Sequence, residues 1–339
     1  MRRHVLTTLV AVLLAMMLAM RIGLSMPQIA MACVFIVMQP QPRLVLTKSL
    51  YRLLGTVAGG LATVALATLF SQTPARFLSA IGAWVSLCTS VATFSSQFRA
   101  YAIVLTGYTA VLVGIPALFE PEHMDTEALM RLVEVGLGIL CAACVALFDS
   151  AVFGRHGPAG GAAPAAATAQ PPVRAAVLAA LYPASAMLAT APLWIGTSWP
   201  GGAMATLNAT VNCALVALAP HPLRAAAQMS GGTLLAVAVG LAFQCLLPAL
   251  AEGPGAYLAL APALALGAWL TARPARLGFG LGYSITVCML AFPGGLAQAH
   301  RPTRLDDAAG IVLSIVVLMA VSAALQRLRE ARPCQSCHG

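Results

Sequence analysis

Long apolar runs, bounded by charged residues, Pro or Gly, constrain the fold of this chain more than any other feature. A membrane-spanning helix needs about 20 predominantly apolar residues to cross about 30 Å of hydrocarbon. Twelve runs approach that length, near residues 5–21, 26–42, 50–71, 77–95, 100–119, 131–153, 175–195, 200–219, 227–250, 255–272, 277–297 and 307–326. The sequence therefore predicts an all-α integral membrane protein with about twelve transmembrane helices.

The composition excludes an ordinary soluble globule. Apolar residues make up 60% of the 339 residues and charged residues 9%, and the mean hydropathy is +0.88. A soluble domain carries about 25% charged residues, because its large surface must be covered by polar groups. The net charge of +9 does not indicate nucleic acid, since the arginines are scattered between apolar runs and Lys48 is the single lysine.

The basic residues predict the orientation. With the N-terminus in the cytoplasm, fourteen of the 19 Lys and Arg residues fall on the inner side of the twelve runs. Cytoplasmic loops of membrane proteins carry such an excess. We therefore expect a multi-pass protein of the bacterial inner membrane with both termini in the cytoplasm.

The chain repeats itself. IGLSMP at Ile22–Pro27 returns as IGTSWP at Ile195–Pro200, and further matches keep the same order at offsets of 173 to 180 residues. These matches pair Gly55-Thr56 with Gly232-Thr233, Tyr108 with Tyr283, Arg131 with Arg304, and Glu134 with Asp307. The chain is therefore interpreted as a duplicated six-helix unit.

The repeat predicts the domain organisation. Residues 1–153 form the first six-helix repeat and residues 175–326 the second, joined by a flexible Ala/Gly/Pro linker at 154–174 and followed by a cytoplasmic tail at 327–339. Because six is even, both repeats start on the same side and are parallel, related by an approximate two-fold axis along the membrane normal. Repeated halves of this kind are the usual architecture of transporters, with a pathway at or near their interface.

Three stretches resemble a known family. MQPQPRLVLTKSLYRLLGTVAGG, RLVEVGLGILCA and PLWIGTSWPGGA are similar to motifs of the fusaric acid resistance (FUSC-like) family of inner-membrane exporters. The resemblance implies efflux of aromatic carboxylic acids or related toxic compounds, often beside a periplasmic membrane-fusion adaptor protein. Many members carry a large cytosolic domain between the halves, where this chain has only the linker, so the role of that domain does not transfer.

Each of the repeated segments, IGLSMP and IGTSWP, ends in a proline at the start of an apolar run. Proline is tolerated in the first helical turn, so Pro27 and Pro200 mark helix N-termini on the outer side. Helix N-termini favour anions, and two of them related by the two-fold axis are candidates to flank an anionic substrate. The alternative is that the prolines only begin two helices.

Two carboxylates follow arginines at a spacing of three. Glu134 follows Arg131, and Asp307 follows Arg304. Residues at i and i+3 lie on one helix face, so each pair is either a local salt bridge or contains a proton-coupling carboxylate. Driven export by proton exchange needs such a group.

Lys48 and Arg52 lie four residues apart at the inner end of the third run. They are interpreted either as positive-inside anchors or as an electropositive vestibule that gathers anions. Their place in the family-like motif favours the vestibule, and Asp149 is a candidate partner.

Polar and aromatic side chains complete the predicted substrate path. Asn208 and Asn212 share one helix face and either bridge to neighbouring helices or contact substrate. The aromatic candidates for stacking a substrate ring, with interfacial anchoring as the alternative for the two tryptophans, are Tyr108, Tyr283, Trp194 and Trp199.

No catalytic set, metal site or cofactor is predicted. The tail sequence CQSCHG matches haem attachment in spacing, but the cytoplasmic placement of the tail argues against it. The favoured function is a secondary, proton-driven exporter of small organic anions, and not an enzyme. The alternatives are a passive anion channel, a membrane enzyme and a non-transporting envelope scaffold.

Overall fold

A computed structural model describes residues 2–39, 41–70, 73–119, 124–153, 173–246, 259–291 and 304–330. These residues are almost entirely helical and contain no strand. The helices of the first half are α1 (Arg2–Ile22), α2 (Pro27–Val37), α3 (Pro42–Phe70), α4 (Pro74–Ala92), α5 (Gln97–Ala117) and α6 (Met124–Phe153). Those of the second half are α7 (Val173–Thr197), α8 (Gly201–Ala217), α9 (Pro222–Leu246), α11 (Ala261–Thr271), η3 (Pro274–Arg276), α12 (Leu277–Ala291) and α13 (Arg304–Glu330).

Each predicted apolar run overlaps one of these α-helices. Among the described residues, eight helices are long and apolar enough to cross a membrane: α1, α3, α4, α5, α6, α7, α9 and α13. The apolar helices α2 and α11 have 11 residues each and are shorter than a full span. The protein is therefore a multi-pass helical membrane protein, and the number of spans stays a prediction.

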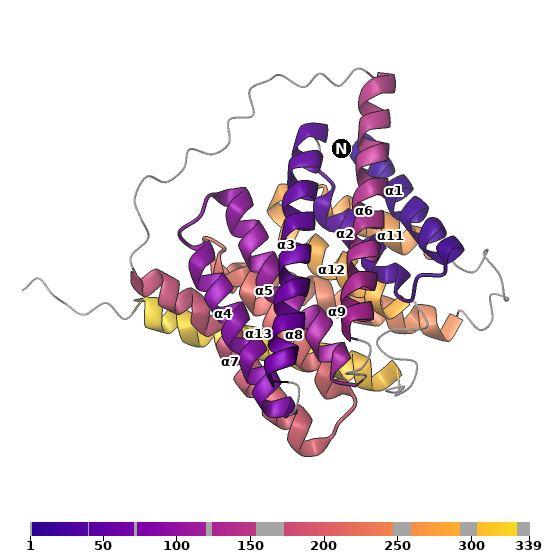
Figure 1. Ribbon diagram of the computed structural model, residues 1–339. Coiled ribbons are helices and arrows are strands. Elements are labelled where there is room, and N and C mark those ends of the chain that lie inside the picture. The colour runs from indigo at the N-terminus through magenta and orange to yellow at the C-terminus, as the bar shows by residue number, and fades with distance from the viewer. Residues whose placement is uncertain are drawn as a thin grey trace, which may run out of the picture.

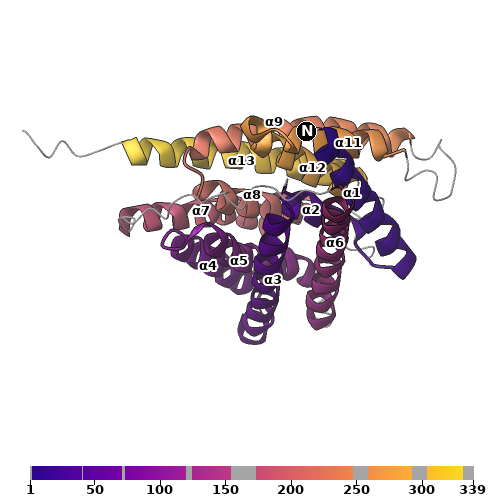
Figure 2. The same ribbon diagram turned by 90° about the horizontal axis from the view of Figure 1, so that it is seen from above.

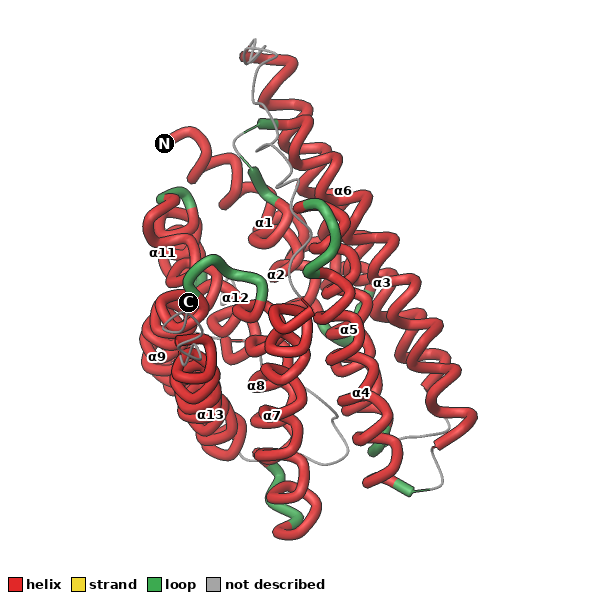
Figure 3. Tube along the Cα trace, turned by 90° about the vertical axis from the view of Figure 1, so that its left-hand side faces the viewer, coloured by secondary structure: helices red, strands yellow, loops and turns green. Residues whose placement is uncertain are grey.

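The helices lie in three layers (Figures 1, 2 and 3). Figures 2 and 3 show α9, α11, α12 and α13 on one side and α3, α4, α5 and α6 on the other, with α2, α7 and α8 between them. The middle helices are the most enclosed. All residues of α2 except Pro27 and Ile36 are buried, and most of α8 is buried as well.

Glycines set the closest helix contacts. A Cβ atom at Gly59 of α3 would lie 2.7 Å from the Thr106 carbonyl oxygen and 2.6 Å from Thr109 Cβ, both on α5. A Cβ atom at Gly232 of α9 would collide with the Phe279 carbonyl of α12. Only a residue without a side chain fits these positions, so the glycines let α3 approach α5 and α9 approach α12.

The helix contacts of one half recur in the other. Within the halves, α1 packs on α2 as α7 packs on α8, α2 on α6 as α8 on α13, α3 on α5 as α9 on α12, and α4 on α5 as α11 on α12. Between the halves, α4 packs on α7 as α11 packs on α1, and α5 on α8 as α12 on α2. The helices that meet between the halves therefore include α2, α5, α8 and α12.

Some helix boundaries differ from those predicted from the sequence. The third helix begins at Pro42 rather than near residue 50. Its first three turns therefore include Arg43, Lys48 and Arg52. Lys48 and Arg52 lie six and ten residues after Pro42, and their place at the inner end of the third span stays a prediction. Of the predicted linker, residues 154–172 lie outside the described residues, as does the CQSCHG motif of the tail.

Candidate anion-binding site

A cationic cluster lies where α2, α3 and α5 meet. The guanidinium of Arg52 donates from Nη1 to the hydroxyl oxygens of Tyr101 and Tyr108, at 3.0 and 3.3 Å. Its Nε donates to Cys33 Sγ at 3.0 Å. Lys48 Nζ lies 5.5 Å from the centroid of the Tyr101 ring. We call these five residues the Arg52 cluster.

The helix geometry explains why these side chains meet. Lys48 and Arg52 are one turn apart on α3, and Gly55 and Gly59 follow on the same face. Those glycines bring α5 close, so Tyr101 and Tyr108, two turns apart, face the guanidinium. Tyr101 lies seven residues before Tyr108, on the same helix face, and this spacing is the sequence signal that would have identified it. No sequence signal pointed to Cys33.

The Arg52 cluster carries positive charge without a carboxylate. Arg52 is 5% exposed, and no Asp or Glu contacts Arg52 or Lys48 in the part of the chain that the structure describes. The expected partner Asp149 instead contacts Arg3, with Oδ1 3.1 Å from Nε. That expectation was wrong because the start of α1 lies beside the end of α6 and supplies a nearer cation. A buried cation with only neutral partners is costly within a membrane, which makes the Arg52 cluster a candidate functional site.

The second half has no equivalent charge. The Gly55–Gly232 match aligns Arg52 with Met229, a buried methionine on α9. Tyr283, the counterpart of Tyr108, donates its hydroxyl to the Ala263 carbonyl oxygen at 3.2 Å. A buried arginine therefore stands at this aligned position in the first half, and a methionine stands there in the second.

Glu134 occupies the N-terminus of α2. Its Oε1 accepts hydrogen bonds from the backbone N–H of Met26 at 2.9 Å and from Ser25 Oγ at 3.3 Å. Its Oε2 lies 3.5 Å from Arg131 Nη1, and both side chains are almost fully buried. The anion held at this helix start, which Pro27 opens, is therefore the chain's own carboxylate.

Arg131 ties the same turn to α5. Its Nη2 donates to the Leu112 carbonyl oxygen at 3.4 Å and lies 3.7 Å from Met26 Sδ. Cys33 Sγ in turn donates to the Val135 carbonyl oxygen at 3.5 Å. The short helix α2 is therefore fixed at its start by Arg131 and Glu134, while its middle contacts the Arg52 cluster.

The repeated segment IGTSWP is held by different contacts from those of IGLSMP. Trp199 donates from Nε1 to Asp306 Oδ1 at 2.9 Å, so IGTSWP is tied to α13 as IGLSMP is tied to α6. Pro200 is the N-cap residue of α8 rather than its first helical residue. Sequence reasoning chose Asp307, and it missed Asp306 one residue earlier. The side chain of Arg304 lies outside the described residues, so its pairing with Asp307 stays a prediction.

The remaining candidates do not gather around one point. The ring of Trp194 lies 5.7 Å from that of Phe119, and Asn208 donates back to the Met204 carbonyl oxygen at 3.1 Å. Asn212 is half-buried and has no hydrogen bond to a described residue. Of the four aromatic candidates, only Tyr108 contacts a charged candidate for the substrate path in the described structure.

The fold and this cluster define a class: a multi-pass helical membrane protein with a buried cationic site. The profile of the fusaric acid resistance protein family matches residues 1–153 and again residues 149–335, so the chain belongs to that family. No solved structure matches the chain.

Three curated relatives are similar over part of the chain. The fusaric acid resistance protein FusC of Burkholderia cepacia is 40% identical over 107 residues, 31% of either protein. The uncharacterized transporter YdhK of Escherichia coli is 33% identical over 141 residues, 41% of this chain and 21% of the relative. The p-hydroxybenzoic acid efflux pump subunit AaeB of Edwardsiella ictaluri is 33% identical over 94 residues, 28% of this chain and 14% of the relative. The matches thus span under a third of each relative's length.

Proposed function

We propose that this protein is a secondary exporter that moves small aromatic carboxylic acids out of the cytoplasm in exchange for protons. Membership of the family and the names of two relatives support efflux of organic acids as the class of function. The observation that carries the proposal is the buried Arg52 guanidinium, whose contacts are all neutral.

The chemistry of the Arg52 cluster fits such a substrate. A guanidinium binds a carboxylate through charge-assisted hydrogen bonds, and Lys48 adds a second cation one turn away. The two tyrosine hydroxyls hold the guanidinium in place and offer further hydrogen bonds. The Tyr101 ring, already near Lys48, provides an aromatic face for the ring of the acid.

We further propose that the chain forms two parallel six-helix repeats with twelve spans. The recurring helix contacts and the two successive matches to the family profile support this arrangement. The substrate path then runs between the halves, beside α2, α5, α8 and α12, with Arg52 facing it from the first half only. With one Arg52 cluster per chain, the proposed exporter binds one carboxylate at a time.

Glu134 is the proposed proton-coupling group. As a carboxylate it holds the N-terminus of α2 and pairs with Arg131; when protonated it loses the charge that favours both contacts. Release of the α2 start would then loosen the helix that also contacts the Arg52 cluster. With both termini in the cytoplasm, Glu134 lies on the outer side, where a periplasmic adaptor protein is the proposed partner.

Inside-out membrane vesicles test the exporter directly. We expect p-hydroxybenzoate to accumulate above its external concentration when the vesicle interior is acidified, and a protonophore to abolish the accumulation. A passive anion channel would only equilibrate the acid, and a scaffold would give no flux. Either result would contradict the proposal.

A further inference from the structure

The repeated segments IGLSMP and IGTSWP end their preceding helices at different places. In the first half α1 ends at Ile22, and Gly23 follows with a φ of 77°, which glycine adopts without steric cost. The N–H of Gly23 donates to the Met20 carbonyl oxygen at 3.2 Å. The N–H of Leu24 donates to the Ala19 carbonyl oxygen at 2.9 Å. These two bonds form the Schellman motif, which commonly ends a helix at glycine.

The matching glycine of the second half does not end its helix. Gly196 lies within α7, which continues to Thr197 and so passes the counterpart of the α1 end, Ile195, by two residues. The left-handed residue is instead Ser198, with a φ of 51°, and no other described residue except glycine has a positive φ. A side chain strains this conformation, and such strain persists only where surrounding contacts hold it. We call the segment Gly196–Trp199 the α7–α8 turn.

In the first half, an acid of the sixth helix holds the start of α2. Glu134 accepts hydrogen bonds from Ser25 Oγ and from the N–H of Met26. At the same offset of 173 residues, the second half carries Asp307, Ser198 and Trp199. The second half therefore has the groups that the same arrangement needs.

Those groups are not joined in the second half. The N–H of Trp199 donates to Thr197 Oγ1 at 3.3 Å, and its indole donates to Asp306. Asp307 is half-buried and makes no hydrogen bond to a described residue. Leaving a partly buried carboxylate without a donor is costly. If α7 ended at its glycine, as α1 does, Ser198 and the N–H of Trp199 would be free to bind Asp307.

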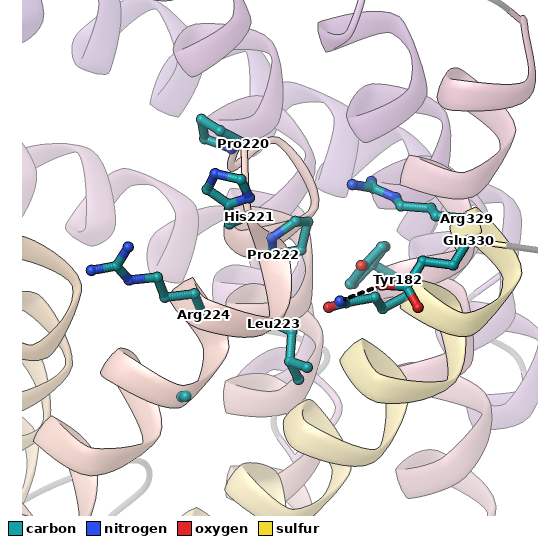
Figure 4. Close-up of a pocket in the computed structure, with 10 residues that line it drawn as sticks. Tyr182, Pro220, His221, Pro222, Leu223, Arg224, Arg329 and Glu330 are labelled. Carbon is teal, nitrogen blue, oxygen red and sulfur yellow. Dashed lines mark hydrogen bonds between the residues drawn. The ribbon is translucent and has the colours of Figure 1, made fainter.

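The helix that follows the turn can stay in place during such a change. Gly201 and Gly310 let the backbones of α8 and α13 touch at the start of α8. At the other end, Arg329 of α13 donates to the Ala217 carbonyl oxygen at 3.4 Å and lies 5.6 Å from the Tyr182 ring of α7. Figure 4 shows Arg329 and Tyr182 on the same side of the α8–α9 turn. Because α13 holds both ends of α8, only the α7–α8 turn has to move.

The α7–α8 turn lies where the two halves meet. Trp194, in the last turn of α7, has its ring 5.7 Å from that of Phe119, which follows α5 in the first half. A Cβ atom at Gly202 of α8 would also press on Trp194. In the predicted orientation this is the outer end of the path between α5 and α8. A change in the end of α7 would therefore alter the outer end of that path.

We propose that the α7–α8 turn has two states and serves as the outer gate of the substrate path. In the observed state α7 ends at Thr197, and the Trp199 indole is bound to Asp306. In the second state Gly196 takes the left-handed conformation, and Asp307 holds the start of α8 as in the first half. The use as a gate rests on the proposed export, whereas the two states do not.

Fluorine NMR of the full chain labelled with 5-fluorotryptophan in detergent tests for the two states. The chain has four tryptophans, and Trp199→Phe identifies the Trp199 signal. Gly196→Ala disfavours the second state, because alanine is strained at positive φ, and its Cβ atom meets nothing within 4 Å in the observed state. Ser198→Thr keeps the hydroxyl but disfavours the observed state, because a β-branched residue is strained there. We expect the two variants to shift the populations reported by the Trp199 signal in opposite directions.

Gly136→Ala is the matched control for the NMR measurement. Gly136 is also a helical glycine whose Cβ atom would meet nothing within 4 Å, so the substitution should leave the Trp199 signal unchanged. A Trp199 signal that is the same in the wild type, Gly196→Ala and Ser198→Thr would overturn the two states.

Transport by Gly196→Ala tests the gate. The variant should be at least as stable as the wild type, because alanine favours a helix over glycine. It should nevertheless transport p-hydroxybenzoate at least about fivefold more slowly, the factor by which alanine disfavours the left-handed conformation. Normal transport together with a changed Trp199 signal would overturn the gate. Absence of transport by the wild type would overturn the proposed export and leave the NMR test of the two states standing.

Discussion

At the scale of single residues, the meaning of a charge depends on what surrounds it. Arg52 and Arg131 are both buried arginines, at 5% and 3% exposure. Arg131 has Glu134 beside it and fixes a helix start, whereas the hydrogen bonds of Arg52 within the described residues go to a thiol and two phenol hydroxyls. A paired buried charge is consistent with a structural role alone, whereas a buried charge without a counter-charge is a candidate for a functional role.

Tyr108→Phe tests the role of the phenol hydroxyls. The substitution removes one hydrogen bond to the guanidinium and should raise the KM for p-hydroxybenzoate about fivefold, corresponding to about 1 kcal/mol. Tyr51→Phe is the matched control, because Tyr51 lies on the same helix as Arg52 and stacks on Phe98 without a hydrogen bond from its hydroxyl to a described residue. Equal KM values for the two variants would argue against contact between the cluster and substrate.

Glu134→Gln tests proton coupling, but it leaves Arg131 buried without its counter-charge. The single variant should therefore lose about 3–5 kcal/mol of stability. The double variant Arg131→Gln/Glu134→Gln removes both charges and should recover most of the lost thermal stability. If Glu134 is the coupling group, the folded double variant transports substrate down its gradient only. Accumulation that is still sensitive to a protonophore in the double variant would rule Glu134 out.

At the scale of helices, glycine positions decide which elements can touch. Gly59 and Gly60 are neighbours on α3 with opposite surroundings. A Cβ atom at Gly59 would press on α5, while one at Gly60 would meet only Ala128 Cβ at 3.9 Å. The sequence alone marks both as small residues in a membrane helix and does not distinguish them.

Gly59→Ala should destabilise the fold, and Gly60→Ala should not. Overpacking at the α3–α5 contact costs about 1–3 kcal/mol, because α5 must move away. Gly60→Ala should be neutral or stabilising by up to about 1 kcal/mol, since alanine favours the helix over glycine. Thermal unfolding in detergent measures both. Equal melting temperatures would show that α3 and α5 are not in close contact.

Sequence patterns predicted the helices well and the site only in part. Apolar runs located the helices because hydrophobic length is a local property. The start of α3 was missed because the predicted run began at residue 50 and left out Arg43 and Lys48, which belong to the helix. The Glu134 contact with the α2 start, the Trp199–Asp306 pair and the Cys33 contact depend on tertiary packing, which spacing along one helix does not reveal.

At the scale of the whole molecule, the two halves are alike in their helix contacts and differ in their polar residues. The contacts between helices recur across the halves, but Arg52 has Met229 as its counterpart. The two halves thus share a set of helix contacts, while each half carries different polar groups. A substrate path between the halves would be lined by the Arg52 charge on the side of the first half only.

Cysteine labelling in intact cells tests the parallel arrangement. Ile22 and Thr197 are the exposed last residues of α1 and α7, and Ile22→Cys and Thr197→Cys should both react with a membrane-impermeant thiol reagent added from outside. His221→Cys, in the α8–α9 turn, should react only after the cells are opened. Labelling of Ile22→Cys and Thr197→Cys from opposite sides would show inverted rather than parallel repeats.

Uptake of p-hydroxybenzoate by proteoliposomes containing Arg52→Met tests the central claim most directly. Methionine is what the second half carries at the matching position, so it fits the apolar surroundings without charge. We expect uptake to fall at least about 30-fold, equivalent to about 2 kcal/mol for a lost buried charge contact. Arg43→Met, which removes an exposed arginine from the same helix, should transport normally. Normal uptake by folded Arg52→Met would contradict the assignment of the Arg52 cluster as the substrate site.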